Sequence, residues 1–354
     1  MRHFILLLTL LPHILLAESP PPFTGGLLLE LTGASSPNGQ ACKVGFDAAQ
    51  KHLAPGGKVA GRQVRLVYGD SQREARVGLS EFRKLVDIDG AGFVVTLSSP
   101  VCMAVNPVSK QKGVPVFGIA GQADFVRENP YAFRFWLSAQ AEGRAHAERL
   151  FSDGKRKAAV VTLEDDWTLS VSDSFKHRFL ELGGEIVSDL EIPPASYEPA
   201  VIFTKVKAAA PQAIFVNLGI PQLGSAFRKI HELGISSTVH SNAWAQLSAV
   251  KEVAGAEAIS GVVVTMPKAP QRFLEMLGES AADPSTRPLA LTCYCALGTA
   301  LKVLEENPGI KNAADFQRAM EGVKKIAIPG VELDFRDREA QYEVEFYRIE
   351  GSLP

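Results

Sequence analysis

The chain has 354 residues, of which 46% are apolar and 21% charged, and its formal net charge is −2. This composition is that of a globular protein and excludes an intrinsically disordered chain, while the near-neutral charge without runs of like charge disfavours nucleic acid and anionic membranes as partners. The length exceeds what one hydrophobic core ordinarily organises, so we expect two domains.

The chain starts with the pattern of a secretory signal peptide. Arg2 and His3 give a short basic start, residues 4–16 are almost wholly apolar, and Ala17 offers a small side chain for cleavage. An uncleaved membrane anchor is the alternative, but the apolar run of about 13 residues is shorter than the roughly 20 that span a bilayer. We therefore expect a signal peptide at residues 1–17 and a mature protein that is soluble in the periplasm.

Segments of strand type and helix type alternate after a proline-rich junction. The predicted strands of the first half are residues 26–31, 63–68, 92–97 and 114–117, and the predicted helices are residues 40–53, 75–86 and 101–112. Strands that alternate with helices over short loops indicate βαβ units and a parallel sheet.

The same alternation restarts at residue 139. Helices are predicted at 139–153, 170–182, 199–209 and 223–233, and strands at 158–162, 186–191, 213–217, 238–240 and 261–265. Two further helices, 289–306 and 313–322, and two strands of alternating character, 331–335 and 342–349, complete the pattern. The sequence therefore predicts two α/β halves, each built on its own sheet.

Two serines stand at a junction between a predicted strand and a predicted helix. Ser98 and Ser99 follow the strand at 92–97, and Pro100 comes next. Ligands of parallel sheets bind at the carboxyl ends of the strands, where serine hydroxyls and the free N–H groups of a first helical turn can hold a carboxylate. The alternative is that one serine only caps the helix, with proline as the first helical residue.

Four cysteines could be oxidised in an exported protein. Cys42 and Cys102 each lie near the start of a predicted helix and could form a disulfide. Cys293 and Cys295 are two positions apart in one predicted helix and point to different sides, so they are not expected to pair with each other. Alternatively, all four are small buried apolar side chains.

The ordered series of segments resembles the periplasmic solute-binding proteins of ABC importers, in the leucine/isoleucine/valine-binding class. The segments that carry the resemblance are 31–50 (LTGASSPNGQACKVGFDAAQ), 61–87 (GRQVRLVYGDSQREARVGLSEFRKLVD), 96–121 (TLSSPVCMAVNPVSKQKGVPVFGIAG), 261–268 (GVVVTMPK) and 294–297 (YCAL). The resemblance runs over about residues 25–349, nearly the whole mature chain.

This resemblance implies the α/β fold of the type I periplasmic binding proteins, in which two Rossmann-like lobes with parallel sheets are joined by three hinge crossovers. Lobe one would comprise residues 24–138 and 269–326, and lobe two residues 139–268 and 327–354. The lobes of this family close on a small ligand by hinge motion.

The resemblance also implies the binding residues. In the amino-acid binders, lobe one holds the ligand carboxylate through a serine after the third strand and through backbone and hydroxyl groups after the fourth. The matching positions here are Ser98, Ser99, Ala120, Gly121 and Gln122, and the matching positions of lobe two are Trp167, Thr168, Gly219, Asn242 and Trp244.

Lobe two departs from the pattern of the amino-acid binders. Ala243 stands near the position of the acidic residue that pairs with the ligand ammonium, and a buried ammonium without an anion costs several kcal/mol. Asp165 or Asp166 could supply the charge instead. Because Trp167 and Trp244 favour a flat ligand, we expect an aromatic or other non-amino organic acid, with a branched-chain amino acid as the alternative.

The sequence shows no pattern of catalysis or of a cofactor. Four histidines, His52, His146, His177 and His231, fall in predicted helices and are expected at the surface. His240 ends a strand near the expected cleft, where it could bind ligand, respond to pH or be an ordinary strand-end residue. Residues 164–166 are acidic and could hold a metal, but a solvated loop is the preferred interpretation. We expect no enzyme, no cofactor and no metal site.

The expected partners are a small-molecule ligand and an ABC permease of the inner membrane, with the protein itself a monomer. The alternative is a module that presents ligand to a separate membrane sensor. A sensor on one chain would carry a membrane-spanning segment after the lobes, and none is expected before Pro354.

Overall fold

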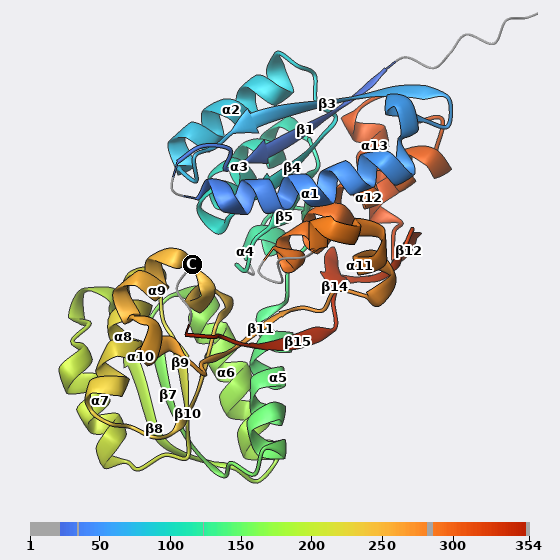
Figure 1. Ribbon diagram of the computed structural model, residues 1–354. Helices are drawn as coiled ribbons and strands as arrows, with labels where there is room; N and C mark the ends of the chain where they lie inside the picture. Colours follow the sequence, from blue (N-terminus) through green and yellow to red (C-terminus); the bar gives the residue numbers. More distant parts are fainter. Residues whose placement is uncertain (1–21, 34, 123, 282–285, 352–354) are drawn as a thin grey trace, which may run out of the picture.

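The computed structural model describes residues 22–33, 35–122, 124–281 and 286–351. These residues form two mainly parallel sheets, each covered by helices on both faces (Figure 1). The expected signal peptide at residues 1–17 lies outside them. Among the described helices, none is long and apolar enough to cross a membrane.

The larger sheet and its helices form lobe one. Its strands lie in the order β12 (Lys325–Ile328), β13 (Val331–Arg336), β14 (Glu339–Gln341), β6 (Ala132–Arg134), β5 (Val116–Ile119), β4 (Phe93–Leu97), β1 (Phe23–Leu29), β3 (Arg62–Asp70) and β2 (Lys58–Val59). β1 lies in the interior of the sheet and is parallel to both of its neighbours, β3 and β4. It is apolar along most of its length because helices cover both of its faces.

Two separate cores lie on the two faces of this sheet. One face is covered by α1 (Ser36–Leu53), α12 (Arg287–Glu306), α13 (Ala313–Glu321) and α11 (Gln271–Leu277), and the other by α2 (Ala75–Asp87), α3 (Ser99–Lys112) and α4 (Asp124–Arg127). α1 and α12 approach each other closely, since a Cβ atom on Gly45 would lie 2.0 Å from the carbonyl oxygen of Ala290. α12 is therefore a central helix, which explains its nearly uniform apolar sequence.

The disulfide between Cys42 and Cys102 that the sequence left open is not formed. Cys42 of α1 is bonded to Cys293 of α12, with Cα atoms 5.2 Å apart, while Cys102 and Cys295 are free and buried. Cys102 lies on α3, which covers the opposite face of the sheet from α1. The bond joins residues 251 positions apart, a distance over which local sequence patterns carry no information about contact.

The smaller sheet and its helices form lobe two. Its strands lie in the order β15 (Val344–Arg348), β11 (Val263–Pro267), β10 (Thr238–Ser241), β9 (Ala213–Asn217), β7 (Lys157–Leu163) and β8 (Glu185–Ile192). Only the edge strand β15 is antiparallel to its neighbour. The covering helices are α5 (Ala139–Ser152), α6 (Asp166–Glu181), α7 (Pro199–Ala208), α8 (Ile220–Glu232), α9 (Ser248–Ala254) and α10 (Ala256–Ile259).

The chain passes between the lobes three times, between β6 and α5, between β11 and α11, and between β14 and β15 (Figure 1). This architecture confirms the predicted fold of two α/β lobes. The assignment of residues 327–341 to lobe two is wrong, because β14 pairs in parallel with β6 of lobe one, and β13 pairs antiparallel with β12 and β14. Alternating burial identifies a strand but does not say which sheet edge it joins.

Candidate functional site

A cleft of about 580 Å³ lies between the carboxyl ends of the two sheets. Eight of the ten predicted binding residues line it, namely Ser98, Ser99, Ala120, Gly121, Gln122, Trp167, Gly219 and Trp244. It is also lined by residues that were not predicted as contacts, among them Glu30, Asn38, Arg73, Trp136, Asp165, Gln246 and Pro288. A site of this size, shared between lobes, suits a small organic molecule.

The lobe-one side of the cleft offers polar atoms without protein partners. Ser99 Oγ accepts a hydrogen bond from the backbone N–H of Gly121 at 3.4 Å and so joins the loops that follow β4 and β5. Within the described part of the chain, Gln122 Oε1 is buried without a hydrogen-bond partner, and the buried Ser98 hydroxyl forms no close hydrogen bond but lies near enough to the Glu30 carboxyl to lower the pKa of that group. Buried polar groups are normally satisfied, so these atoms mark a place where a ligand can supply the missing partner.

Ser98 has a strained backbone. Its φ of 72° is a conformation that L-residues other than glycine rarely adopt. The N–H of Ser98 donates to the carbonyl oxygen of Ile119 at 3.1 Å, and Cys102 N–H donates to Ser98 carbonyl at 2.9 Å, so both sides of the residue are fixed. The strain turns the chain sharply at the start of α3 and is of the kind that structures retain at binding sites.

Glu30 is a buried carboxyl group beside these serines. It follows β1, its side chain is fully buried, and its Oε2 accepts a hydrogen bond from Asn38 Nδ2 at 3.3 Å. Burial raises the pKa of Glu30, and the charge of Arg73 opposes this shift. The sequence contained one signal for Glu30, a single acidic residue within the apolar run GLLLEL, which was interpreted only as a strand.

The lobe-two side of the cleft is aromatic. The rings of Trp167 and Trp244 lie with their centroids 4.5 Å apart at an angle of 47°. Among described atoms, Trp167 Nε1 is buried without a hydrogen-bond partner. A Cβ atom on Gly121 of lobe one would lie 2.9 Å from this nitrogen, so the two lobes approach each other closely at this point.

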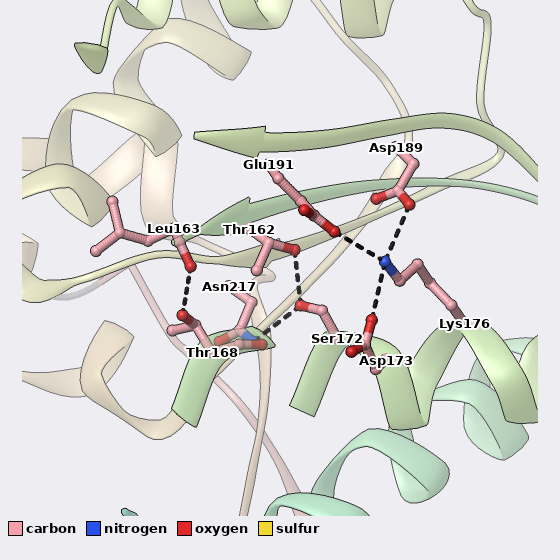
Figure 2. A network of polar contacts seen from close by, with 9 residues as sticks. All are labelled: Thr162, Leu163, Thr168, Ser172, Asp173, Lys176, Asp189, Glu191 and Asn217. Atoms are coloured by element: carbon pink, nitrogen blue, oxygen red, sulfur yellow. Dashed lines mark hydrogen bonds and ion pairs between the residues drawn. The ribbon is translucent and has the colours of Figure 1, made fainter. Parts of the chain in front are cut away.

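A polar network fixes the start of α6 and thereby Trp167 (Figure 2). Asn217 Nδ2 donates to the carbonyl oxygen of Thr168 at 2.7 Å and to Ser172 Oγ at 3.0 Å, and Thr162 Oγ1 donates to Ser172 Oγ at 2.8 Å. The Thr168 hydroxyl donates to the carbonyl oxygen of Leu163 at 2.5 Å. These buried contacts tie α6 to β7 and β9.

The charged side of α6 is tied to β8 in the same view. Lys176 Nζ lies 3.0 Å from carboxylate oxygens of both Asp173 and Asp189, and 3.3 Å from Glu191 (Figure 2). Because the network continues from the buried hydroxyls to the surface, the helix that carries Trp167 is held along two turns.

The prediction that Thr168 and Asn242 line the cleft is wrong. Both are buried, and Asn242 Nδ2 donates to Asn217 Oδ1 and to the carbonyl oxygen of Leu218, each at 3.0 Å. The Oδ1 atom of Asn242 accepts from the backbone N–H of Trp244 at 3.1 Å. The two residues therefore position the tryptophans, because short polar side chains satisfy the backbone at the strand-to-helix turns.

The position expected to be acidic in the amino-acid binders is Ala243, which lines the cleft. Asp165 lines the cleft as well, but its Oδ1 accepts from the backbone N–H groups of Trp167 and Thr168 at 3.0 and 3.1 Å. Asp165 is thus the N-cap of α6, and the acidic loop that contains it is part of a helix start. Among the described residues, no group of histidine, cysteine, aspartate and glutamate has the geometry of a metal site.

The prediction that His146 lies at the surface is wrong. His146 and His240 are both buried, with their Nδ1 atoms 3.0 Å apart, and His146 Nε2 lies 3.2 Å from Thr265 Oγ1. Burial lowers the pKa of His240 to about 3 and the pKa of His146 well below its usual value. His240 does not line the cleft. The two histidines are uncharged and form a buried contact between α5 and β10. His52, His177 and His231 are exposed as expected.

Arg134 connects the cleft with the crossovers. This buried side chain donates from Nη1 to the carbonyl oxygen of Gly121 at 3.0 Å and from Nη2 to Glu339 Oε2 at 2.6 Å. Arg134 lies on β6 and Glu339 on β14, the strands that precede the first and third crossovers. Arg134 therefore fixes the loop that carries Gly121 and Gln122 to the strands that lead into the crossovers.

Comparison with known families and sequences identifies relatives of the whole chain. A family model described as periplasmic binding protein matches residues 23–352. A curated relative, the Leu/Ile/Val-binding protein homolog 6 of Brucella suis biovar 1, is 25% identical over 322 residues, which are 86% of this chain and 81% of the relative.

Solved structures share the fold. A leucine-binding protein of Thermotoga maritima superposes with a TM-score of 0.77 at 19% identity, covering 93% of this chain and 96% of its own. A solute-binding protein of an ABC transporter from R. palustris, solved with 4-hydroxybenzoate, gives a TM-score of 0.76 at 19% identity and covers 93% of each chain. At these identities the similarity concerns the fold alone.

Proposed function

The chain belongs to the periplasmic binding protein family, and from this premise we propose that it is the solute-binding component of an ABC importer. Its ligand is a small carboxylate-bearing aromatic acid that binds in the cleft between the lobes. The observation that carries this proposal is the division of the cleft into two chemically different walls, a hydroxyl and amide wall at Ser98, Ser99 and Gln122 and an aromatic wall at Trp167 and Trp244.

The polar wall suits a carboxylate for two physical reasons. α3 begins at Ser99, so its N-terminus directs the positive end of the helix dipole and unpaired N–H groups toward the ligand. The Ser98 hydroxyl can donate a hydrogen bond to the carboxylate, and Gln122 can donate through its amide N–H, while its unpartnered Oε1 can accept only from a donor group of the ligand. The tryptophan pair of the opposite lobe then covers the body of the ligand by stacking.

The protein acts by binding alone. A ligand that contacts both walls stabilises the closed arrangement through its higher affinity for that arrangement. The close approach of Gly121 to Trp167 marks where the lobes meet, and Arg134 transmits the position of the Gly121 loop to the hinge strands. The closed, loaded protein then docks on a membrane permease, which takes up the ligand.

We place the mature protein in the periplasm. The family supports a location outside the cytoplasm, and the basic and apolar start of the sequence has the form of an export signal.

A branched-chain amino acid is the second candidate ligand. The names of the Brucella relatives support it, and two carboxyl groups that line the cleft, Glu30 and Asp165, could receive an ammonium. The aromatic acid is preferred because Asp165 already accepts two backbone hydrogen bonds and Ala243 stands where an acidic partner would be expected.

Calorimetry and thermal unfolding of the purified mature protein test these alternatives. The panel is benzoate, 4-hydroxybenzoate, 3,4-dihydroxybenzoate, leucine, isoleucine and valine. We expect the aromatic acids to raise the midpoint of unfolding by several degrees at 100-fold excess over Kd, since this excess adds about 2.7 kcal/mol. Ser99→Ala should weaken binding of the same acids. Stabilisation by leucine and by none of the aromatic acids would overturn the proposed ligand class.

A further inference from the structure

The lobe-one wall of the cleft has a second polar region, separate from the serine site. In the sheet, β3 lies beside β1, and β1 beside β4. Arg73 follows β3 and Ser99 follows β4, so their positions are two strands apart, or about 10 Å. Both residues line the same cleft. A ligand held at Ser99 can therefore present its far end to Arg73.

An unusual turn brings Arg73 to the cleft. The N–H of Glu74 donates to the carbonyl oxygen of Ser71 at 2.8 Å, and both central residues have positive φ, 51° at Gln72 and 62° at Arg73. This is the geometry of a type I′ turn, which normally requires glycine, asparagine or aspartate. The turn holds Arg73 in a conformation that its side chain does not favour.

The carboxylate of Asp70 keeps this strained turn in place. Asp70 Oδ1 accepts from the backbone N–H groups of Leu31 and Gln72 at 2.9 and 3.1 Å, and Oδ2 accepts from the Thr32 hydroxyl at 2.5 Å. Burial opposes ionisation of Asp70, but these hydrogen bonds outweigh it and hold its pKa below the ordinary value. The Ser71 hydroxyl completes the turn by accepting from the N–H of Arg73 at 3.3 Å.

The guanidinium group of Arg73 is available to bind a ligand. Within the described chain it forms no hydrogen bond and no ion pair within 4.0 Å, and its interaction with Glu30 is one of charge at longer range. The Glu30 carboxyl is bonded to Asn38 instead. The neighbouring Arg76 is exposed and does not line the cleft.

We propose that Arg73 binds a second carboxylate of the ligand, at the end opposite to the carboxylate held by Ser99. This inference rests on the proposed function and narrows the ligand to an aromatic dicarboxylate whose two groups lie at opposite ends of the ring. A planar guanidinium matches a carboxylate with two parallel hydrogen bonds, which a hydroxyl group cannot reproduce.

Calorimetric titration with benzoate, 4-hydroxybenzoate and benzene-1,4-dicarboxylate tests the inference. The wild-type protein should bind the dicarboxylate more tightly than benzoate, on the order of 10- to 100-fold. Arg73→Gln should remove this gain and leave the affinity for benzoate within about twofold. Arg73→Lys should keep part of the gain, because it keeps the charge but not the planar pair. Arg76→Gln is the matched control and should behave as wild type.

The outcomes distinguish failure of the inference about Arg73 from failure of the proposed function. If benzoate binds and depends on Ser99, but the dicarboxylate binds no more tightly and Arg73→Gln changes nothing, the inference about Arg73 is overturned and the proposed function stands. If 4-hydroxybenzoate binds more tightly than the dicarboxylate in both wild type and Arg73→Gln, the second-carboxylate inference is again overturned. If no aromatic carboxylate binds to the wild-type protein, the proposed function fails and the inference with it. Unchanged thermal unfolding of the Arg73 variants would exclude misfolding as the cause of any loss.

Discussion

At the scale of single residues, the cleft combines strain with unmet hydrogen-bonding capacity. Ser98 has a left-handed backbone and a buried hydroxyl without a close hydrogen bond, and Arg73 has a left-handed backbone and a guanidinium whose interaction with Glu30 is one of charge at longer range. The left-handed backbones of both residues lower the stability of the empty protein. Their coincidence at the carboxyl ends of β4 and β3, which flank β1, is the pattern expected where a ligand supplies the missing partners.

Substitution of Ser98 separates the effect of its backbone strain on stability from the effect of its hydroxyl group on ligand binding. Ser98→Gly should relieve the backbone and Ser98→Ala should not, so the glycine variant should be the more stable by about 1 kcal/mol in urea unfolding. Both variants lose the hydroxyl and should bind the aromatic acid about tenfold more weakly, the effect of one hydrogen bond. Equal affinity of Ser98→Gly and wild type would show that the hydroxyl does not contact the ligand.

At the scale of elements, lobe one depends on the contact between its first long helix and a late one. α1 and α12 are joined by the bond between Cys42 and Cys293 and by a close backbone approach at Gly45. α1 also carries Asn38 at its cleft end, where it holds Glu30. The packing of α12 thereby supports the wall of the binding site.

Removing the disulfide should destabilise the protein without abolishing the fold. We expect the Cys42→Ala/Cys293→Ala double variant to lose roughly 2–5 kcal/mol of unfolding free energy, because the bond closes a long loop of the unfolded chain. Reduction of the wild type should give a similar loss, and reductant should not affect the double variant. Cys102→Ala, which alters a free buried cysteine, should keep the full response to reductant. A wild type that does not respond to reductant would contradict the disulfide.

At the scale of the whole molecule, titratable groups are buried beside the crossovers. Glu142 and His146 lie on α5, directly after the first crossover, and His240 packs against His146. Burial raises the pKa of Glu142 to about 8, with Thr265 and Arg134 opposing the shift, and lowers the pKa of His240 to about 3. Among described atoms, the carboxyl oxygens of Glu142 form no close hydrogen bond, and the Thr265 hydroxyl only partly offsets the effect of burial. The folded protein therefore favours the neutral forms of Glu142 and His240.

These shifts predict that stability falls above about pH 6.5 and below about pH 4.5, and that the contributions of Glu142 and His240 oppose each other between these two values. Folded Glu142 keeps its proton up to about pH 8, whereas the unfolded chain releases it near pH 4.5, so stability is lost as pH rises through this window. Folded His240 stays neutral down to about pH 3, whereas the unfolded chain gains a proton near pH 6.5, so stability is lost as pH falls below 6.5, by about 1.4 kcal/mol per pH unit.

Urea unfolding of Glu142→Gln at pH 5.5, 7.0 and 8.5 checks the alkaline side. The variant cannot ionise at this position, so its stability relative to wild type should rise steadily with pH, by a few kcal/mol in all. Below about pH 4.5, where Glu142 is protonated in both the folded and the unfolded chain, the variant should follow the pH dependence of the wild type, since the histidines remain. A constant difference between variant and wild type at the three pH values would show that Glu142 is not protonated in the folded protein.

The sequence by itself determined the elements and the side of the sheets where the site lies. Helices and strands followed from periodicity, which depends on neighbours a few positions apart, and the serines at the end of β4 followed from the rule that ligands bind at the carboxyl ends of parallel strands. Ser98 and Ser99 line the cleft for this reason, whereas the other six predicted residues that line it followed from the resemblance to the family. Thr168 and Asn242 stand beside true lining residues but turn inward, which depends on the turn geometry and not on the spacing.

Only the tertiary structure decided which distant segments meet. It joined Cys42 to Cys293, placed β13 and β14 in lobe one, buried His146 against His240, and brought Glu30 and Arg73 to one wall of the cleft. Each of these contacts links elements far apart in the chain or depends on the direction in which one side chain points. Local patterns constrain the conformation of a segment, whereas contact between segments depends on burying their apolar faces together, which is a property of the whole fold.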